Sequence, residues 1–496
     1  MRQAERTTTG RRRDYCRTCL PPCRTVLLLV MVFSGAGLAQ VSPPDQRWRT
    51  LEEPFRLQMD QQVPLEKRVP LDWGGWFRSS VWAIDEDVDR PNDRTHNGYH
   101  ALRWQQLRLW GSATVDQTHQ FYARGLLDYY DWNHHTSYNG RDSDWRGFDL
   151  ERGWYDFRLS RWQQARGEQP GEVDLGVTVG RQYVEFGTGL ALSLPLDAVK
   201  ATGYCRDWQL TGLGALSVPS THNVDQSVPG NTHESRRYWG VELRYHGAPD
   251  HEPFAYYLSQ DDQDAGIIRD GYQFGYDSRY VGAGSRGRFF RRDLQYTCEV
   301  VGEFGNSYAN QTPDDAVVND RQTVRAWALD AELRYVAPDA HRSQIAVEYL
   351  LASGDSDRLF SPTNTLGGNR LHTTDTSFVG WGYRDTGLVL APQISNLGVV
   401  RLGASTFPFN RVAACEQLEA GLDFYLFHKQ QAAGAASDNF SIRDHAWLGT
   451  EMDFSVNWRL LSDLAWFFRY GIFLPGEAFL TQKDRQLVFT GVTLSF

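Results

Sequence analysis

The sequence predicts an all-β fold, a single large antiparallel transmembrane β-barrel of about 18 strands of the outer-membrane type. Three observations near the end of the chain support this. Over 448–460, Leu448, Met452 and Phe454 alternate with Glu451 and Asp453, which is the period of a strand. One face carries large aromatic residues and the other is ionic, and the connections are alternately short and long. A soluble β-sandwich is the alternative, because its strands also alternate.

Length and composition agree with this fold class. The chain has 496 residues, more than one ordinary soluble core needs, whereas a barrel grows by adding strands around a lumen. Its 45 glycines and its 13% of aromatic residues fit turns and membrane girdles. A mean hydropathy of -0.51 excludes a bundle of membrane-spanning helices but allows a barrel. The net charge of -10 argues against nucleic acid as a partner.

The chain divides into three predicted parts. Residues 1–39 form a signal peptide, with an arginine-rich start, an apolar run at 26–33 and small residues before Gln40. That run is too short to span a bilayer. Residues 40–72 show no clear period and are expected to be an N-terminal periplasmic segment or linker. Residues 73–496 are predicted to form the outer-membrane β-barrel.

Strand-like runs recur throughout the barrel segment. We expect strands near 74–84, 101–115, 118–131, 152–163, 172–186, 204–217, 236–247, 253–260, 270–281, 288–304, 322–336, 342–353, 376–390, 396–406, 417–428, 447–460, 463–473 and 486–496. Polar connecting segments are the candidate outer loops, at 85–99, 133–148, 219–235, 311–320, 354–375 and 430–444. Any of these loops could fold into the lumen as a plug.

The alternation also assigns charged residues to the lumen. The predicted pore-lining residues from this pattern are Arg124, Arg158, Arg244, Arg459, Arg469, Glu451 and Asp453. Asp128, Asp156, Glu242, Asp330, Glu348, Glu419 and Asp423 are expected on the same inner face. Two interpretations stay open. Arginines and carboxylates could neutralise one another and stiffen the wall, or a subset of unpaired arginines could attract anions.

No catalytic, metal-binding or cofactor-binding residues are predicted. The sequence contains no G-x-S-x-G elbow, H-E-x-x-H motif or P-loop. Cys16, Cys19 and Cys23 have the spacing of metal ligands but lie in the leader. The other cysteines, Cys205, Cys298 and Cys415, are scattered and allow one disulfide at most. An outer-membrane lipase would need a Ser–His pair at the rim, and the pattern offers none.

Several short motifs resemble one known family. The sequences at 448–453 (LGTEMD) and 473–479 (FLPGEAF) resemble the closing strands of the bacterial alginate export family of outer-membrane barrels. Gly180-Arg181-Gln182 resembles an earlier strand of that family, and 352–355 (ASGD) a stretch in mid-barrel. The resemblance extends over roughly 73–496. It implies an eighteen-stranded barrel that passes an anionic polysaccharide through an arginine-rich pore, with Arg181 as a further pore-lining residue.

The alternation disagrees with the resemblance at Arg181. Counting from Val179 places Arg181 on the apolar face, unless Gly180 marks a β-bulge. The chain also departs from the family pattern at 189–190, where a basic residue is expected, and at 205–208, where a Phe-Asp-Gly element is expected. These departures leave the barrel unaffected and bear on which polymer passes.

The predicted function is an outer-membrane channel for passive transport or export of an anionic polysaccharide or oligosaccharide. A general porin without polymer specificity is the alternative, and an outer-membrane enzyme is the third reading. The expected partners are the anionic saccharide, outer-membrane lipid, and the barrel-insertion machinery of a diderm bacterium through the C-terminal Phe496.

Overall fold

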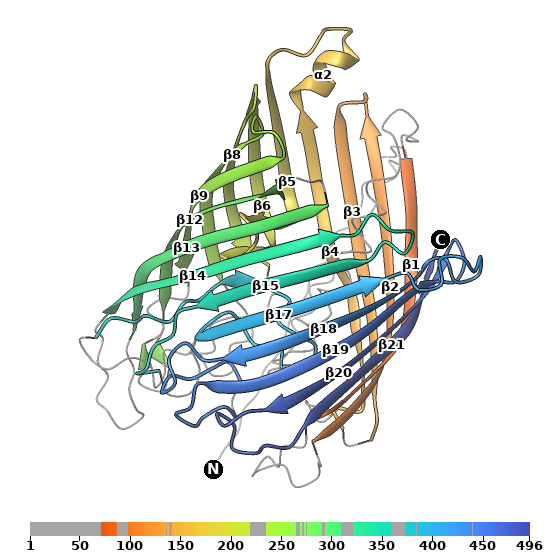
Figure 1. Ribbon diagram of the computed structural model, residues 1–496. Helices are drawn as coiled ribbons and strands as arrows, with labels where there is room; N and C mark the ends of the chain where they lie inside the picture. The colour runs from red at the N-terminus through yellow and green to blue at the C-terminus, as the bar shows by residue number, and fades with distance from the viewer. Residues whose placement is uncertain are drawn as a thin grey trace, which may run out of the picture. The chain divides into compact units, whose positions relative to one another are not determined.

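The computed structural model describes residues 71–86, 98–134, 136–137, 141–218, 235–263, 268–269, 272–273, 275–289, 293–308, 321–358, 373–382, 384–438 and 440–496. Within these ranges, 18 antiparallel strands form the wall of a closed barrel, as the sequence predicted (Figure 1). The wall closes where the first strand pairs with the last, from Trp76 opposite Ser495 to Asp85 opposite Gln486.

The elements follow one another around the wall in chain order. The wall strands are β1 (Leu71–Asp85), β2 (Tyr99–Val115), β3 (His119–Trp132), β4 (Ser143–Arg158), β5 (Val173–Phe186), β6 (Leu192–Cys205), β7 (Trp208–Ser217), β8 (Arg236–Tyr245), β9 (His251–Asp262), β12 (Tyr276–Phe289), β13 (Leu294–Tyr308), β14 (Arg321–Val336), β15 (Gln344–Ala352), β17 (Leu397–Thr406), β18 (Leu418–His428), β19 (Trp447–Arg459), β20 (Leu464–Pro475) and β21 (Arg485–Ser495). The remaining elements are α2 (Leu159–Ala165), the short pair β10 (Ile268–Arg269) and β11 (Tyr272–Gln273), and β16 (Trp381–Gly382).

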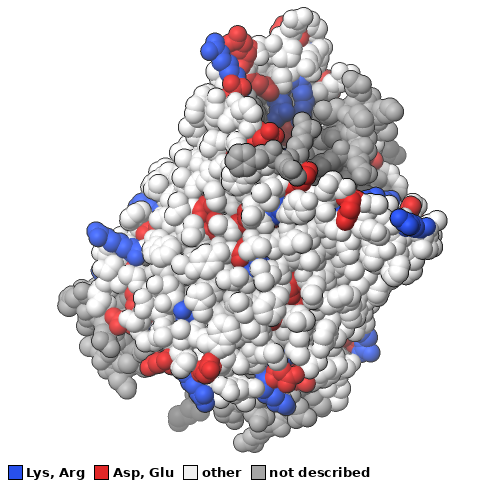
Figure 2. All heavy atoms as spheres, viewed as in Figure 1, with Lys and Arg blue, Asp and Glu red and all other residues white. Residues whose placement is uncertain are grey.

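The wall has two chemically different faces. In β8, Trp239, Val241 and Leu243 are 46%, 45% and 40% exposed, while Tyr238 and Glu242 at the alternate positions are almost completely buried. Side chains of a strand point alternately to opposite faces, so the apolar set faces outward and the buried set faces the lumen. The outer surface in Figure 2 is mostly uncharged, as contact with hydrocarbon requires.

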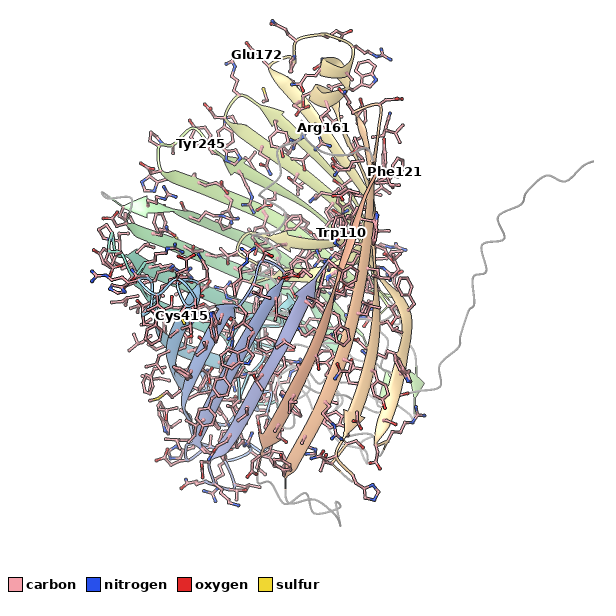
Figure 3. All side chains as sticks on the ribbon, turned by 90° about the vertical axis from the view of Figure 1, so that its right-hand side faces the viewer. Trp110, Phe121, Arg161, Glu172, Tyr245 and Cys415 are labelled. Carbon is pink, nitrogen blue, oxygen red and sulfur yellow. The ribbon has the colours of Figure 1, made fainter. Side chains whose placement is uncertain are left out.

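The two ends of the barrel differ. At one end the connections are mostly short, for example 206–207 and 460–463; at the other they include 218–235 and 353–396. We name these the short-turn end and the long-loop end. Helix α2 lies at the short-turn end, where Figure 3 also labels Arg161 and Glu172. Short periplasmic turns are the rule for such barrels, so the short-turn end is assigned to the periplasm.

Outward aromatic side chains gather at the short-turn end. Trp208 packs on Tyr245 with ring centroids 4.6 Å apart, and Phe289 stacks on Tyr296 at 4.3 Å. All four lie near strand ends beside short turns. They form part of an aromatic girdle, which marks the level of a membrane–water interface.

The α-helical content is small. In the described ranges, no helix is long and apolar enough to cross a membrane.

Two segments leave the wall and fill part of the lumen. Strand β5 pairs with β4 only as far as Arg181, and β6 pairs with β7 only from Leu196 onward. The part between them, residues 182–196, turns inward, and we name it the inner hairpin. Its Leu192 and Ser193 pair in parallel with β16. Strand β16 belongs to residues 373–396, which we name the inner loop.

The inner hairpin and inner loop share a dry core with the wall. Phe186, Leu190 and Leu192 of the hairpin are buried with Phe378, Trp381 and Val389 of the loop. Tyr238, Tyr256, Tyr276 and Tyr280 from the lumen face of β8, β9 and β12 complete this core. A loop that fills the lumen was one of the possibilities that the sequence left open.

Two strand predictions were wrong, and their errors cancel in the strand count. The expected strand at 376–390 is part of the inner loop, and β6 was missed. The inner loop and the first residues of β6 supply buried residues to the core inside the lumen, so these residues lack the one-sided alternation of a lipid-facing strand, which β6 shows only from Leu196 onward. Strand β4 also differs from expectation, because it begins at Ser143 and ends at Arg158, where α2 follows. The expected loop 311–320 lies outside the described residues, as does 219–235 except for Ser235.

Gly180 does not mark a bulge. The register of β5 continues without a shift against β4 and β6. The backbone of Gly180 nevertheless has φ +125°, and a Cβ there would lie 2.3 Å from the carbonyl oxygen of Gly153. The glycine is therefore required by its conformation and by the close approach of β4.

This requirement predicts a loss of stability for Gly180→Val. A side chain at this φ costs about 1–3 kcal/mol before any clash is counted. The variant should convert to its heat-denatured form at a lower temperature than wild type in a gel-mobility assay. Gly214→Ala in β7 is the matched control, since a Cβ atom at Gly214 would have no other atom within 4 Å. Equal conversion temperatures for Gly180→Val and wild type would contradict the expectation.

Candidate functional site

The lumen face of β2, β3 and β4 carries a cluster of arginines. Nε of Arg108 lies 3.1 Å from a carboxylate oxygen of Glu151, and Nε of Arg124 lies 2.7 Å from the same oxygen. Arg152 stands directly opposite Arg124 in the β3–β4 register and adds its charge near Glu151. We name these four residues the arginine cluster. The four residues together carry three positive charges and one negative charge.

An irregularity in β4 builds this cluster. The β3–β4 register shifts between Arg124 and Gly125, and again between Leu126 and Asp128. In a regular strand the consecutive residues Glu151 and Arg152 would point to opposite faces. The shift allows both to act on the same side of the wall. Sequence alternation placed Arg124 in the lumen and gave no signal for Glu151 or Arg152, because 147–151 has no period.

Trp76 of β1 lies beneath two of the arginines. The guanidinium carbon of Arg124 is 5.3 Å from the centre of its ring, and that of Arg108 is 5.7 Å away. Both distances are within the range of a cation–π interaction. The arginines are therefore held against an aromatic surface as well as by Glu151, which fixes their position on the wall.

Arg244 of β8 has a different role in this structure. It contacts Glu242 at 2.6 Å and Glu252 at 2.9 Å, and it donates a hydrogen bond of 3.2 Å to the carbonyl of Gly187. Gly187 is the turn of the inner hairpin, and its N–H donates to Glu242 at 3.1 Å. Arg244 is thus paired with carboxylates and fastens the hairpin.

Glu451 and Asp453 bind the inner loop. Glu451 is 1% exposed and accepts the backbone N–H groups of Leu388, Val389 and Leu390 at 2.5 to 2.8 Å. Asp453 accepts a further hydrogen bond from the N–H of Leu388 at 2.9 Å. Consecutive N–H groups converging on a carboxylate form an anion-binding nest. Both side chains face the lumen, and both are engaged by the protein itself.

Arg384 is a charged residue of the lumen that sequence reasoning missed. It forms ion pairs with Asp330 of β14 and, at 3.1 Å, with Glu348 of β15. It also donates to the carbonyl of Thr188 in the inner hairpin at 3.0 Å. Burial lowers the pKa of Arg384, but the charges of Asp330 and Glu348 outweigh burial, so its pKa is above the ordinary value. The residue was overlooked because 376–390 was interpreted as a strand.

The remaining predicted residues lie apart from the arginine cluster. Arg158 and Arg459 are at the short-turn end, where Arg158 is 3.6 Å from Asp174 and Arg459 donates to the carbonyl of Ser462. Arg469 of β20 donates to Asn457 at 2.6 Å. Arg181 pairs with Asp197, through two hydrogen bonds of 2.9 and 3.0 Å.

Arg181 keeps the outward side that alternation gave it. Val179 on the same side is 40% exposed, whereas Gln182 and Val184 on the other side are buried. Arg181 also donates to the carbonyl of Leu150 in β4 at 2.8 Å. It therefore ties the base of the inner hairpin to the wall at the point where the two separate.

No metal site stands out in the part of the chain that the structure describes, where no three His, Cys, Asp or Glu side chains are grouped to hold an ion. Cys205, Cys298 and Cys415 are free thiols.

A closed barrel with an apolar outer face, an ionic lumen and an aromatic girdle defines an outer-membrane channel protein. The model of the alginate export family matches residues 77–493 of this chain. The chain therefore belongs to the alginate export family, as its motifs suggested. Its family and fold are those of export channels and porins, which are not enzymes, and its place is the outer membrane.

Solved structures support the fold. The chain is similar to OccK11 (OpdR) of Pseudomonas aeruginosa, with a TM-score of 0.51 and 11% identity over 86% of this chain and 96% of that one. It is also similar to OccK8 (OprE) of the same organism, with a TM-score of 0.50 and 10% identity over 86% and 98% of the two chains. No curated protein matched the sequence.

Proposed function

We propose that this protein is a passive channel that conducts an anionic polysaccharide or oligosaccharide across the outer membrane. The arginine cluster is the observation that carries the proposal. Arg108 and Arg124 pair with Glu151 and Arg152 lies opposite Arg124, so the four residues together carry a net positive charge on the lumen face, which attracts a polyanion. The alginate export family supports an anionic saccharide as the cargo.

The arrangement suits conduction rather than tight capture. Arg108 and Arg124 already interact with Glu151 and with the ring of Trp76, and the guanidinium carbon of Arg152 lies 5.5 Å from the centre of the Tyr183 ring, so a passing carboxylate competes with existing partners. Conduction requires sites that bind strongly enough to admit the substrate and weakly enough to release it. Arg469, which has no ion pair among the described residues, extends the positive surface to β20 on the same face. Arg124 and Arg469 are thus the sequence-predicted arginines that we retain as pore-lining.

Other predicted residues are assigned supporting roles. Arg244, Glu451 and Asp453 hold the inner hairpin and inner loop, and Arg181 fixes the hairpin to the wall. Arg158 and Arg459, at the short-turn end, would meet the polymer at the periplasmic mouth. We further propose residues 1–39 as the signal peptide and 40–72 as a periplasmic segment or linker, whose last two residues, Leu71 and Asp72, already pair in β1. The exposed terminal Phe496, whose backbone pairs with Gly75, is the proposed signal to the insertion machinery.

A general porin is the second candidate. Arg244 with Glu242, Arg384 with Asp330 and Arg401 with Asp423 are balanced ion pairs around much of the lumen. Balanced pairs stiffen a wall without selecting the charge of what passes. This candidate differs from the first in predicting no preference between charged and neutral sugars.

Single-channel recording separates the two candidates. Purified protein in a planar bilayer should show current blockades when an oligomer of mannuronic acid is added, and their frequency should fall as salt is raised. A neutral malto-oligosaccharide of equal length should block far less often. Equal blockade by the two oligomers, or none by the uronate, would contradict the anionic channel.

A further inference from the structure

A row of aromatic side chains lies beside the arginine cluster on the lumen wall. Trp110 of β2 and Tyr122 of β3 stack with ring centroids 6.3 Å apart and planes 20° apart. Tyr122 and Trp154 of β4 stack at 5.3 Å, again with planes 20° apart. We name these three residues the aromatic row. It runs across three neighbouring strands at one level of the barrel; Figure 3 labels Trp110.

The register places this row on the lumen face. Trp110 is directly opposite Arg124, and Tyr122 is directly opposite Trp154. Residues directly opposite each other in an antiparallel pair share a face. Arg124 is buried in the lumen, so Trp110 faces the lumen with it, and Tyr122 does so because it lies two residues from Arg124. By contrast Phe121, also labelled in Figure 3, is 46% exposed on the outer side.

The row is accessible, unlike most aromatic side chains of the lumen. Trp110, Tyr122 and Trp154 are half-buried. Tyr238, Tyr276 and Tyr280 are at most 1% exposed, because the inner hairpin and inner loop cover them. Aromatic rings that only stabilise the fold would be expected to be as deeply buried as these three tyrosines. The row therefore lies where the lumen remains open.

A residue without a side chain stands at each end of the row. Gly74 of β1 is opposite Trp110, and Gly180 of β5 is opposite Trp154. The ring of Trp110 leans over Gly74, where a Cβ would lie 3.0 Å from a ring carbon. Beside Trp154, a Cβ at Gly180 would meet only backbone atoms. The face of Trp154 toward β5 is consequently not covered by a side chain from its cross-strand partner.

The spacing relates the row to the arginines. In β2, β3 and β4 each aromatic residue lies two positions from an arginine of the cluster: Trp110 from Arg108, Tyr122 from Arg124, and Trp154 from Arg152. Two residues of a strand span about 6.6 Å. A guanidinium on its long side chain can therefore reach a carboxylate carried by a ring that rests on the aromatic row. The row lies on the side of the arginines nearer the short-turn end.

We infer that the aromatic row and the arginine cluster together form a binding subsite for a uronic acid residue. The C–H groups of a sugar ring carry partial positive charge and pack on the negative faces of the aromatic rings. The sugar's carboxylate then meets Arg152, the partly exposed arginine of the cluster, while the buried Arg108 and Arg124 contribute their positive charge without touching it. The inference rests on the proposed function for the anionic cargo and adds that the channel recognises the sugar ring itself, which charge alone does not do.

The test uses the full-length protein in planar bilayers with an oligomer of mannuronic acid. Trp154→Leu and Tyr122→Leu should each shorten the blockade about tenfold while leaving its frequency nearly unchanged, because stacking governs release and charge governs approach. Trp154→Phe should restore most of the duration. Trp239→Leu in β8 is the matched control and should behave as wild type, since Trp239 faces outward.

Poly-glutamate supplies the chemical control. It carries carboxylates but no sugar ring, so Trp154→Leu should leave its blockades unchanged. Blockades by the uronate with unaltered durations in both leucine variants would overturn the subsite and leave the anionic channel standing. Equal blockade of wild type by uronate and neutral oligomer, shortened in the leucine variants, would overturn the anionic channel and keep the aromatic row as a sugar site.

A measurement on the wild-type protein covers the case in which a leucine variant does not assemble. Oxidation of exposed tryptophans by N-bromosuccinimide, mapped by mass spectrometry, should be slowed at Trp110 and Trp154 by the uronate oligomer. Trp239 should be oxidised at the same rate with and without the oligomer. Equal oxidation of Trp154 in both conditions would overturn the subsite.

Discussion

Replacing residues 378–394 of the inner loop by three glycines is expected to raise the single-channel conductance at least about twofold, because the open cross-section of the lumen limits the current. The deleted segment includes Trp381, which donates to the hydroxyl of Tyr280 at 2.7 Å, and Val389, which donates to Glu451. The cut is geometrically allowed. The hydroxyl oxygens of Ser377 and Ser395 lie 3.1 Å apart, so the two ends already meet.

The deletion should not destroy the barrel. It removes Arg384 and the N–H groups that satisfy Asp330, Glu348 and Glu451, but the opened lumen admits water to these carboxylates. Leaving them buried without a partner would instead cost several kcal/mol. Heat-modifiable migration in a gel checks assembly. Thr374→Ala, an exposed position of the same loop, is the control and should keep the wild-type conductance. An unchanged conductance in an assembled deletion variant would show that the inner loop does not limit the current.

The wall was predictable from sequence because lipid imposes a simple rule on each strand. In β19, Met452 and Phe454 are more than 40% exposed while Glu451 and Asp453 are buried, as the alternation required. The same rule failed for the inner hairpin and inner loop. Their surroundings are protein on both sides, so Leu192 and Val389 are buried for reasons that no period of two records.

The arginine cluster was only partly predictable. Arg124 follows from the alternation of β3, whereas Arg152 and Glu151 depend on a register shift that is a tertiary feature. Arg108 belongs to the same face, but its strand alternates imperfectly, so the sequence pattern gives only a weak signal for it. The ion pairs of the lumen could not be predicted from the sequence either, because Arg244 and Arg401 pair with carboxylates of other strands. The alignment of the strands therefore decides which arginines lie next to carboxylates.

The inner segments give the lumen two unlike sides. Toward β12 to β15, Glu303, Asp330 and Glu348 are covered by the inner loop and matched to its N–H groups and to Arg384. Toward β1 to β4, Trp110, Tyr122 and Arg152 remain half-exposed. The carboxylates on the first side therefore hold the inner loop, whereas Arg152 and the aromatic rings lie on the side that a solute can reach, with Arg108 and Arg124 buried next to them. In this way a protein with a negative net charge can have positive charge along one side of its lumen.

Neutralising the arginine cluster is expected to have the largest effect on substrate entry. The triple variant combines Arg108→Gln, Arg124→Gln and Arg152→Gln. Its frequency of blockade by a mannuronate oligomer should fall by about one to two orders of magnitude, since a charged lumen accelerates capture to that extent. The dependence of that frequency on salt should also weaken. Glu151→Gln alone should act in the opposite direction and raise the frequency, because it removes a negative charge and makes the cluster more positive.

Two controls separate charge from damage to the wall. Adding Glu151→Gln to the triple variant removes the carboxylate that has lost its arginine partners. This quadruple variant should assemble as well as wild type but should still capture the oligomer slowly. Arg103→Gln lies in the same strand as Arg108 but on its outer face, where Arg103 pairs with Asp131 at 2.8 Å, and it should not change capture. If the quadruple variant captured the uronate at the wild-type rate, the arginine cluster could not be the site that attracts the polyanion. The sign of the Glu151→Gln effect is the stricter test, because general damage to the barrel could slow capture but would not accelerate it.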